Sequence, residues 1–546
     1  MAGAASTVEI AQALPPFLRS RRRLLPWLLG AVYAALLAAA VSRHEMWRDE
    51  IQAWLIARDS SSFRDLVHAM RYEGHPPLWH LLLWPIAHVT WNPAWMQVLH
   101  VAIASASALL LLRFSPFSWL QKILLLAGYF FAFEWAVIAR NYAPVVCCVF
   151  AACSLWPSRW QRPVLLSVPL VLMSLSHAEG LLIALAMLAV LALELVWPRR
   201  GATPGDDTVA ETAGAARAGA GRIVAAAAIA AAGIATSIVL MRPDHDAGFA
   251  HPAYLAWTNE SAPLLAHAVI SGYLPVPRDD LHFWNTNALW PKLREGQTPP
   301  AYAMPAAHAA IASAVLLLAT LVLATRPWTL VMFAAGTASQ LAFFHAIYFG
   351  SVRHHGFLFL VFVTALWMSF HERRLTSGNA RVEAALQWWD RRRTAVVAGL
   401  LVVHVYAAWM ALSTDWNAPF SQAKATAEWI DSYFPDRAPF VFVGDYSPAA
   451  SAVLGYLQQD RMYYPDREEF GSYVLFDTRR QIHDRPKLET QVKDLIQSQQ
   501  RDAVLVLSHG LGPRQGFLSP PRALVHLGNA VESDEQYSVY WIHRRP

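Results

Sequence analysis

Long apolar runs recur along the chain from near the N-terminus to about residue 412, and short polar segments separate them. Runs of roughly 20 apolar residues with few charges are typical of helices that cross the hydrocarbon core of a bilayer. The pattern therefore predicts about eleven membrane-spanning helices. We place them approximately at residues 24–42, 95–113, 119–138, 142–157, 163–176, 178–197, 222–241, 305–325, 328–349, 355–371 and 394–412.

The segments between these runs divide by charge. Arg and Lys gather in alternate loops, from "RSRRR" before the first run to "HERR" after the tenth. Positive residues concentrate in cytoplasmic loops, so the N-terminus is predicted to be cytoplasmic. This alternation requires that the apolar segment 76–91 does not cross the membrane. Its Trp residues and Pro85 instead favour an interfacial or re-entrant helix.

The membrane part is predicted to cover residues 1–414 and to contain three long loops. The first outer loop covers 43–94 and carries helices that lie along the membrane. The segment 198–221 is rich in Gly and Ala, which is typical of a mobile cytoplasmic linker. A second outer loop covers 242–304.

After the last run the composition changes to alternating short strands and helices. We call residues 415–546 the C-terminal domain; an odd number of spans places it outside the cytoplasm. Strands are predicted at "PFVFVGD", "SYVLFD" and "DAVLVLS", and an edge strand at "YSVYWIHR". The predicted fold class is a polytopic α-helical membrane protein with an extracytoplasmic α/β domain that has a mostly parallel sheet.

Composition agrees with a membrane protein and excludes several functions. Of the 546 residues 55% are hydrophobic and 15% are charged, whereas a soluble protein carries about 25% charged residues. The net charge of +5 is small and no basic stripe with aromatics occurs, so no nucleic-acid partner is expected. The three cysteines, Cys147, Cys148 and Cys153, share one apolar run and are interpreted as core residues.

Polar residues at the predicted outer helix ends form one set. Ionisable groups near membrane depth are costly and are usually functional. Arg353 in addition lies outside, against the positive-inside trend, so it needs an anionic partner. The candidate site residues are Asp49, Glu50, His75, Arg140, Tyr142, His177, Glu179, Arg353 and His354.

Each candidate also has a purely structural interpretation. Asp49 and Glu50 could begin a helix, where carboxylates interact favourably with the N-terminal dipole. Arg140 could bury its aliphatic stem in the membrane and place its guanidinium at the membrane–water interface. His177 and Glu179 could bind each other at a hairpin between two helices.

An outer site at membrane depth suits a substrate with a lipid tail and a phosphate-linked sugar. Arg353, with Arg140, would neutralise the phosphate leaving group. An acceptor hydroxyl needs a carboxylate base, and Asp49 is the candidate. A base on the side of the sugar opposite the leaving group gives inversion. Glu50 would orient Asp49, bind the acceptor or raise the pKa of Asp49.

Four motifs resemble the GT-C glycosyltransferases, the group that includes the protein O-mannosyltransferases and the lipid A aminoarabinose transferases. They are the Asp-Glu pair after the first run, the Pro-Pro-Leu-aromatic segment at 76–79, Arg-x-Tyr at Arg140 and Tyr142, and a late outer arginine, Arg353. The resemblance covers roughly Leu24 to Met410. It implies that Asp49 is the acidic catalytic residue, with Glu50 beside it. The chain departs from the group at His75, where some members carry a basic residue, and at Asn141, which separates Arg140 from Tyr142; the C-terminal domain is not shared by every branch of the group.

The resemblance implies a polyprenyl-phosphate sugar donor and a protein, lipid or polysaccharide acceptor, at a bacterial-type inner membrane. No cofactor is required, although His44, Asp49, Glu50 and His75 could converge on a divalent metal. Two other functions remain open. A flippase or transporter for a lipid-linked saccharide would need ionisable residues within spans, of which Glu134 is the clearest, and a non-enzymatic envelope assembly protein would use the C-terminal domain to bind a partner.

Overall fold

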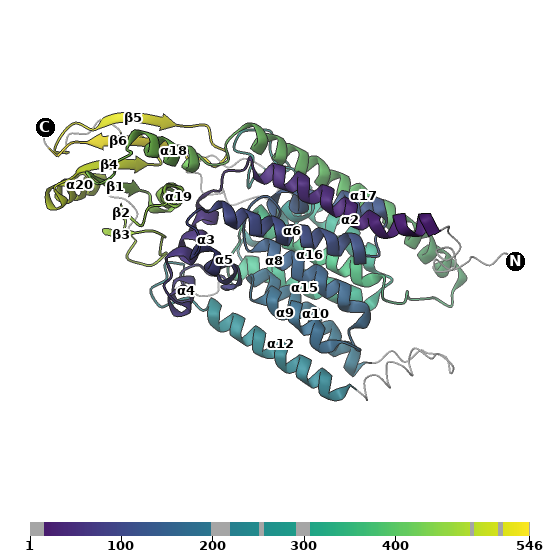
Figure 1. The fold of residues 1–546 in the computed structure, drawn as a ribbon. Coiled ribbons are helices and arrows are strands. Elements are labelled where there is room, and N and C mark those ends of the chain that lie inside the picture. The colour runs from purple at the N-terminus through teal and green to yellow at the C-terminus, as the bar shows by residue number, and fades with distance from the viewer. Residues whose placement is uncertain are drawn as a thin grey trace.

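The protein consists of a helical bundle and a small sheet domain at opposite ends of the molecule (Figure 1). The computed structural model describes residues 16–197, 219–249, 256–290, 306–480, 485–511 and 517–544. The predicted linker 198–221 lies almost wholly outside the described residues, as do parts of the predicted loop 242–304. The first and the last described residues lie at opposite ends of the molecule (Figure 1).

Eight helices among the described residues are long and apolar enough to span a membrane. Each coincides with a predicted span, because a long run of apolar side chains can bury its backbone polar groups in lipid only as a helix. The chain is therefore a polytopic, membrane-embedded helical protein. The eight are α2 (Pro16–Val41), α6 (Ala94–Phe114), α10 (Ala178–Val196), α12 (Ala220–Met241), α14 (Ala306–Leu323), α15 (Pro327–Ala346), α16 (Val352–Ser369) and α17 (Ala380–Asn417).

The other three predicted spans form shorter helices, α7 (Trp119–Leu126), α8 (Tyr142–Leu155) and α9 (Pro163–Ser174). The prediction of one continuous helix over 119–138 is wrong. After α7 the chain forms a π-helix, η1 (Phe130–Glu134), and then turns up to residue 141. Side chains bond this broken segment to its neighbours; the Trp135 indole donates to the Arg353 carbonyl at 3.2 Å. The total of eleven spans stays a prediction.

The first loop contains three short helices, α3 (Arg48–Asp59), α4 (Phe63–Met70) and α5 (Leu78–Ala87). They lie between the bundle and the sheet domain (Figure 1). With 10 residues, α5 is too short to cross a bilayer. Helix α3 packs against α5 on one side and against α19 of the C-terminal domain on another.

The C-terminal domain has a six-stranded sheet in the order β3-β2-β1-β4-β6-β5. The two central strands, β1 and β4, are near-continuous apolar runs, because they are buried on both faces of the sheet. The strands are β1 (Phe440–Asp445), β2 (Met462–Tyr464), β3 (Glu469–Gly471), β4 (Asp502–Leu507), β5 (Arg522–Leu527) and β6 (Tyr537–Ile542), and the helices are α18 (Ala423–Tyr433), α19 (Ser447–Leu457) and α20 (Arg485–Gln499).

Three predictions about this sheet are wrong. It is mixed, since β1 pairs in parallel with β2 and β4 while the other three pairs are antiparallel. Strand β6 lies between β4 and β5 and is not an edge. The segment "SYVLFD" forms no strand, because its backbone bonds elsewhere. Val474 donates to the Gln52 side chain at 2.9 Å and accepts from it at 2.6 Å, which fastens this segment to α3.

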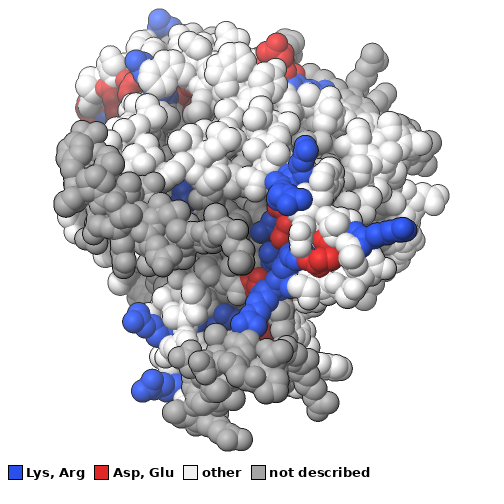
Figure 2. Space-filling view, turned by 90° about the vertical axis from the view of Figure 1, so that its right-hand side faces the viewer, with Lys and Arg blue, Asp and Glu red and all other residues white. Residues whose placement is uncertain are grey.

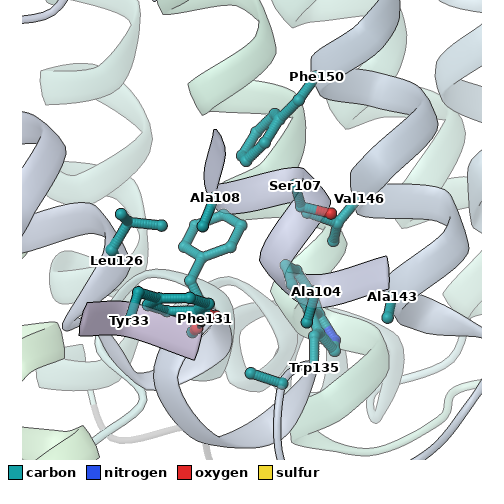
Figure 3. A pocket seen from close by; sticks show the side chains of 11 residues that line it. Tyr33, Ala104, Ser107, Ala108, Leu126, Phe131, Trp135, Ala143, Val146 and Phe150 are labelled. Carbon is teal, nitrogen blue, oxygen red and sulfur yellow. Dashed lines mark hydrogen bonds between the residues drawn. The ribbon is translucent and has the colours of Figure 1, made fainter. Parts of the chain in front are cut away.

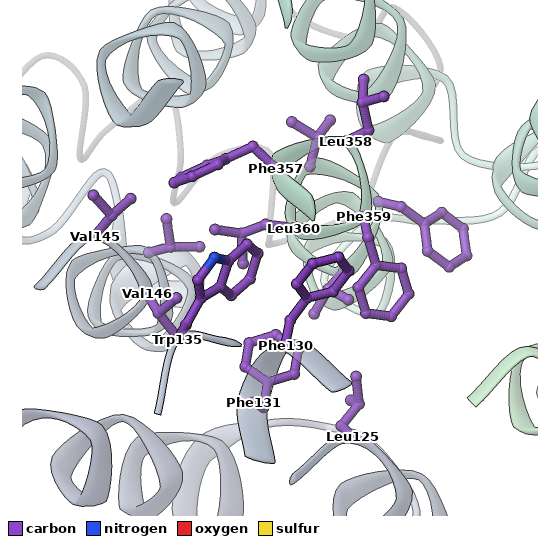
Figure 4. Close-up of a cluster of buried hydrophobic side chains, with 14 of the residues drawn as sticks. Leu125, Phe130, Phe131, Trp135, Val145, Val146, Phe357, Leu358, Phe359 and Leu360 are labelled. Carbon is purple, nitrogen blue, oxygen red and sulfur yellow. The ribbon is translucent and has the colours of Figure 1, made fainter. Parts of the chain in front are cut away.

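The core of the bundle is rich in aromatic side chains from η1, the turn after it and α16. Phe130, Phe131 and Trp135 pack against Phe357 and Phe359 (Figure 4). A small cavity beside Phe131 has a volume of only about 10 Å³ (Figure 3), so it cannot hold a substrate.

A larger apolar cavity, of about 700 Å³, lies between α2, α7 and α17. Its walls are mainly Leu, Val and Ala side chains, from Leu29 near one end to Trp416 and Asn417 in the last turn of α17. A cavity of this size and lining suits a long apolar ligand.

Charged side chains gather on the end of the bundle opposite to the C-terminal domain. Figure 2 looks at this end, where Lys and Arg form a band together with Asp and Glu. Arg326 and Arg374 there contact the carboxylate of Asp390 at 3.4 and 3.8 Å, and Arg393 contacts it at 3.7 Å. An arginine-rich end is the one expected to face the cytoplasm.

Candidate functional site

Asp49 lies in the first turn of α3, where the bundle meets the C-terminal domain. Its Oδ2 contacts Arg140 Nη1 at 3.1 Å and Arg353 Nη2 at 3.3 Å, and its side chain is 29% exposed. No hydrogen bond to Oδ1 occurs among the described residues. We call Asp49, Arg140 and Arg353 the arginine cluster. The fold thus joins three predicted site residues that are far apart in sequence, and leaves one carboxylate oxygen open to a ligand.

Arg353 is held between two indole rings. Its guanidinium carbon lies 5.2 Å from the ring centre of Trp47 and 5.1 Å from that of Trp284, within the range of cation–π attraction. Its Nε and Nη1 are buried and have no hydrogen-bond partner among the described residues. A buried guanidinium with unused donors is unfavourable unless an anion binds there. Arg353 is therefore suited to bind a phosphate.

Glu50 is completely buried and bonded on all sides. Its Oε2 lies 3.0 Å from His44 Nε2 and accepts from the Trp47 amide at 3.2 Å, and its Oε1 accepts from the Ala139 amide at 2.5 Å. Glu50 therefore ties the start of α3 to the segment that ends in Arg140. This placement suits a role in orienting Asp49, and it leaves no path for an acceptor to Glu50.

His44 extends the Glu50 network to the last turn of α17. Its Nδ1 contacts Asp415 at 3.1 Å. Burial by itself lowers the pKa of His44, but the carboxylates of Asp415 and Glu50 outweigh it and raise the pKa well above the usual range. The protonated ring then donates to both carboxylates, which fixes α17, the first loop and the Arg140 segment together.

The remaining predicted residues form a second group beside the arginine cluster. Tyr142 Oη lies 3.2 Å from His354 Nε2, and the His177 ring lies 5.8 Å from that of His354. The His75 ring stacks 6.1 Å from that of His177. Glu179 is buried against His177. All nine predicted residues thus lie in one region, at the end of the bundle that meets the C-terminal domain.

Sequence reasoning missed Glu73, two residues before His75. Its carboxylate accepts from Gln52 at 2.8 Å. Burial raises the pKa of Glu73 to about 7; the Gln52 hydrogen bond and the charge of Arg140 oppose this shift, and the charge of Asp49 adds to it. Glu73 is thus a group that titrates near neutral pH beside the arginine cluster. The only signal in the sequence was a carboxyl next to the Pro-Pro motif.

The C-terminal domain also reaches α3. The Arg48 amide donates to Glu535 at 2.8 Å, and the Arg48 guanidinium lies 3.7 Å from Glu532 and 3.4 Å from Asp534. Burial raises the pKa of Glu535 to about 8, although Arg48 opposes the shift. Two residues after Asp49, Ile51 packs against Gly455 of α19, where a Cβ would clash with the Ile51 side chain. The domain thus fixes the residues on both sides of Asp49.

The side chains of His44, Asp49, Glu50 and His75, which could have converged on a metal, do not form one group with metal-ligand spacing among the described residues. His44 binds Glu50 and Asp415, and Asp49 binds two arginines, so these side chains face different partners. Among the described residues, the group with metal-ligand spacing is His177, Glu179 and His354.

Glu134, the buried carboxylate of η1, is fully bonded. It accepts from Tyr129 Oη at 2.9 Å and from the Trp284 indole at 3.1 Å, and so supports one of the two rings that hold Arg353.

No family model matches this chain, and no curated protein matches it in sequence.

Proposed function

We propose that this protein is a membrane glycosyltransferase that moves a sugar from a polyprenyl-phosphate donor to an acceptor hydroxyl outside the cytoplasm, with inversion. The observation that carries the proposal is the contact of Asp49 with Arg140 and Arg353. A base and two phosphate-binding cations are the parts that such a transfer needs. They lie at the end of the bundle opposite to the arginine-rich face, which supports an extracytoplasmic site in a plasma membrane.

In this proposal the donor phosphate binds to Arg353 and Arg140. Arg353 has unused donors at Nε and Nη1, and a guanidinium can bind two phosphate oxygens at once. As the phosphate binds, it competes with Asp49 for the guanidinium groups. The phosphate leaves as a stable anion, so no general acid is needed, and the arginines stabilise the charge that develops on it.

Asp49 then acts as the general base. Its Oδ1 is open, and its side chain is partly exposed, so an acceptor hydroxyl can approach. The base takes the hydroxyl proton as the oxygen attacks the anomeric carbon, while the bond from this carbon to the phosphate breaks on the opposite side. Trp47 and Trp284, which flank Arg353, hold its guanidinium in place for the phosphate.

The apolar cavity between α2, α7 and α17 suits the polyprenyl tail. It reaches the last turn of α17 at Trp416. In the same turn Asp415 contacts His44, which contacts Glu50, the neighbour of Asp49. A tail in this cavity would therefore end close to the arginine cluster, although no residue of that cluster lines the cavity itself.

The direct test is transfer from a panel of radiolabelled polyprenyl-phosphate sugars in membranes that contain the protein. We expect label from at least one donor to reach an acceptor, and not in membranes that lack the protein. The product should have the opposite anomeric configuration to the donor, which glycosidases of known specificity can show. Retention of configuration would contradict the single-base mechanism.

Arg353→Ala should weaken donor binding by roughly 30-fold or more, because it removes a buried charged partner of the phosphate. Binding of labelled donor to purified protein in nanodiscs measures this. The matched control is Arg392→Ala, since Arg392 likewise lies over an indole, 5.3 Å from the ring centre of Trp388, but in the N-terminal part of α17 at the other end of the bundle. Equal donor affinity in the two variants would remove Arg353 from the phosphate site.

Donor affinity should fall as the pH rises from about 6 to about 8, by roughly three- to tenfold. Glu73, with its pKa raised to about 7, is neutral at the low end and negative at the high end. The negative form competes with the donor phosphate for Arg140, while the phosphodiester keeps its charge throughout. Glu73→Gln should remove most of this dependence of donor affinity on pH, whereas the control Glu428→Gln, at an exposed position, should leave it unchanged. If donor affinity in Glu73→Gln falls with pH as in wild type, Glu73 is not the group responsible.

A further inference from the structure

Three metal-ligand side chains lie together beside the arginine cluster, and the proposed transfer reaction does not use them. His177 directly precedes α10, Glu179 lies in the first turn of α10, and His354 lies in the first turn of α16. One ligand atom of each lies within 4.8 Å of the others, and all three residues are buried. The N-terminal ends of α10 and α16 thus bring the three side chains together. We call them the histidine cluster.

Glu179 has no adequate partner for its charge. Its side chain is fully buried, and neither carboxylate oxygen has a hydrogen-bond partner among the described residues. Nδ1 of His177 touches Oε2 of Glu179 but is also without a hydrogen bond there. Buried carboxylates are normally hydrogen-bonded, paired or bound to a metal. A divalent cation between these atoms would satisfy all of them at once.

The backbone around the cluster holds Glu179 in place. The Gln340 side chain of α15 donates to the Glu179 carbonyl at 3.0 Å, which fixes the first turn of α10. The His177 ring stacks on Phe357, 5.6 Å away and nearly parallel to it. Ligands that are held in this way lose little freedom when a metal binds.

The donor set indicates which metal would bind. Two imidazole nitrogens and one carboxylate oxygen are a common zinc set, and they leave a fourth position open. Zinc bonds of about 2.1 Å place neighbouring ligand atoms roughly 3.4 Å apart, so the three side chains need only small rotations to close. Calcium and magnesium prefer sites made wholly of oxygen and fit less well.

His354 can present the nitrogen that a metal needs. Its Nδ1 lies 3.3 Å from Ser351 Oγ and accepts from the Ser351 amide at 3.1 Å. For Nε2 to bind a metal, the proton must lie on Nδ1, so Nδ1 gives up the hydrogen bond from the Ser351 amide and donates to Ser351 Oγ instead. Tyr142 Oη, 3.2 Å from Nε2, would then lie beside the bound ion.

We propose that His177, Glu179 and His354 bind one divalent cation of the zinc type, with water at the fourth position. Arg353 and Arg140, the nearby cations, are paired with Asp49, which limits their repulsion of the ion. The proposal does not rest on the glycosyltransferase activity. It requires only that the folded chain binds the metal.

The test measures how much zinc the full-length protein binds. The protein is purified without chelators, any bound metal is removed, and the protein is then incubated with Zn²⁺ alone. After desalting, mass spectrometry of the elements should find about one zinc ion per chain. Co²⁺ in place of Zn²⁺ should give the visible absorption of a four-coordinate site. Wild-type protein that holds no zinc above the level of a buffer blank, or gives no cobalt spectrum, overturns the proposal and leaves a His177–Glu179 ion pair as the role of the cluster.

Glu179→Gln identifies the site. It keeps the size of the side chain but removes the charged ligand, so zinc affinity should fall at least about tenfold. The matched control is His100→Leu, because His100 is also buried and its ring nitrogens have no hydrogen-bond partner among the described residues. The zinc affinity of His100→Leu should equal that of wild type. Equal zinc affinity in Glu179→Gln and wild type would place the metal elsewhere. If a variant does not fold, the cobalt spectrum of the wild-type protein still tests the proposal.

Discussion

Asp49→Asn should lower the rate of sugar transfer by roughly 10²- to 10⁴-fold, the usual contribution of a general base. The amide has the same shape as the carboxylate but cannot accept the hydroxyl proton. Donor affinity should be equal or higher, because the neutral amide would no longer compete with the phosphate for Arg140 and Arg353. Single-turnover transfer and equilibrium donor binding, measured on the same preparation, separate the two effects.

Asp59→Asn is the matched control for this variant. Asp59 is the last residue of α3 and is also paired with an arginine, Arg58, at 2.7 Å, but it lies at the other end of the helix. Its transfer rate should stay close to that of wild type. The Asp49 variant also separates the three candidate functions. A flippase would keep donor binding and lose lipid movement, a scaffold would be unaffected, and unchanged transfer would remove Asp49 from the mechanism.

Glu50→Ala should destabilise the protein by about 3–5 kcal/mol, the cost of breaking a buried charge pair from one side. The substitution leaves the amides of Trp47 and Ala139 without their acceptor and leaves His44 with Asp415 alone. Transfer should fall as well, because the position of Asp49 relative to Arg140 depends on Glu50. The thermal midpoint in detergent, followed by circular dichroism, measures the first effect.

Two further variants sharpen the Glu50 test. Glu50→Gln keeps an oxygen for the Ala139 amide but loses the charge that His44 needs, so its midpoint should lie between those of wild type and Glu50→Ala. Glu428→Ala, at an exposed position of α18, should change stability by less than about 0.5 kcal/mol. A midpoint of Glu50→Ala equal to that of Glu428→Ala would show that the network adds little stability.

The long apolar helices could be predicted because lipid allows few alternatives for an apolar segment. The arginine cluster could be anticipated for a related reason. A positive charge on the side where positive charges are rare needs a partner, and Arg353 lies 3.3 Å from Asp49. Such arguments indicate which residues share a face of the membrane, and the fold places them in contact.

Two of the errors have a related physical cause, which is that backbone groups bond to side chains far away in the sequence. The Ala139 amide, one residue after the predicted helix 119–138, donates to Glu50 and holds the turns that follow η1. The Gln52 side chain forms hydrogen bonds with both the amide and the carbonyl of Val474. The segment "SYVLFD" therefore does not join the sheet, although its apolar residues alternate as in a strand. Periodicity describes how a segment bonds to itself or to a similar neighbour, and it contains no information about such partners.

The dependence of α3 on the C-terminal domain has a consequence for biosynthesis. Arg48, the neighbour of Asp49, leaves the ribosome 487 residues before Glu535, whose carboxylate accepts from the Arg48 amide. The membrane helices can insert one after another, but the helix that bears Asp49 gains its full set of contacts only after the segment around Glu535 has been synthesised. A copy that stalls before the segment around Glu535 therefore contains the arginines but lacks this contact to the helix that bears Asp49, and the site is fully assembled only once that segment is present.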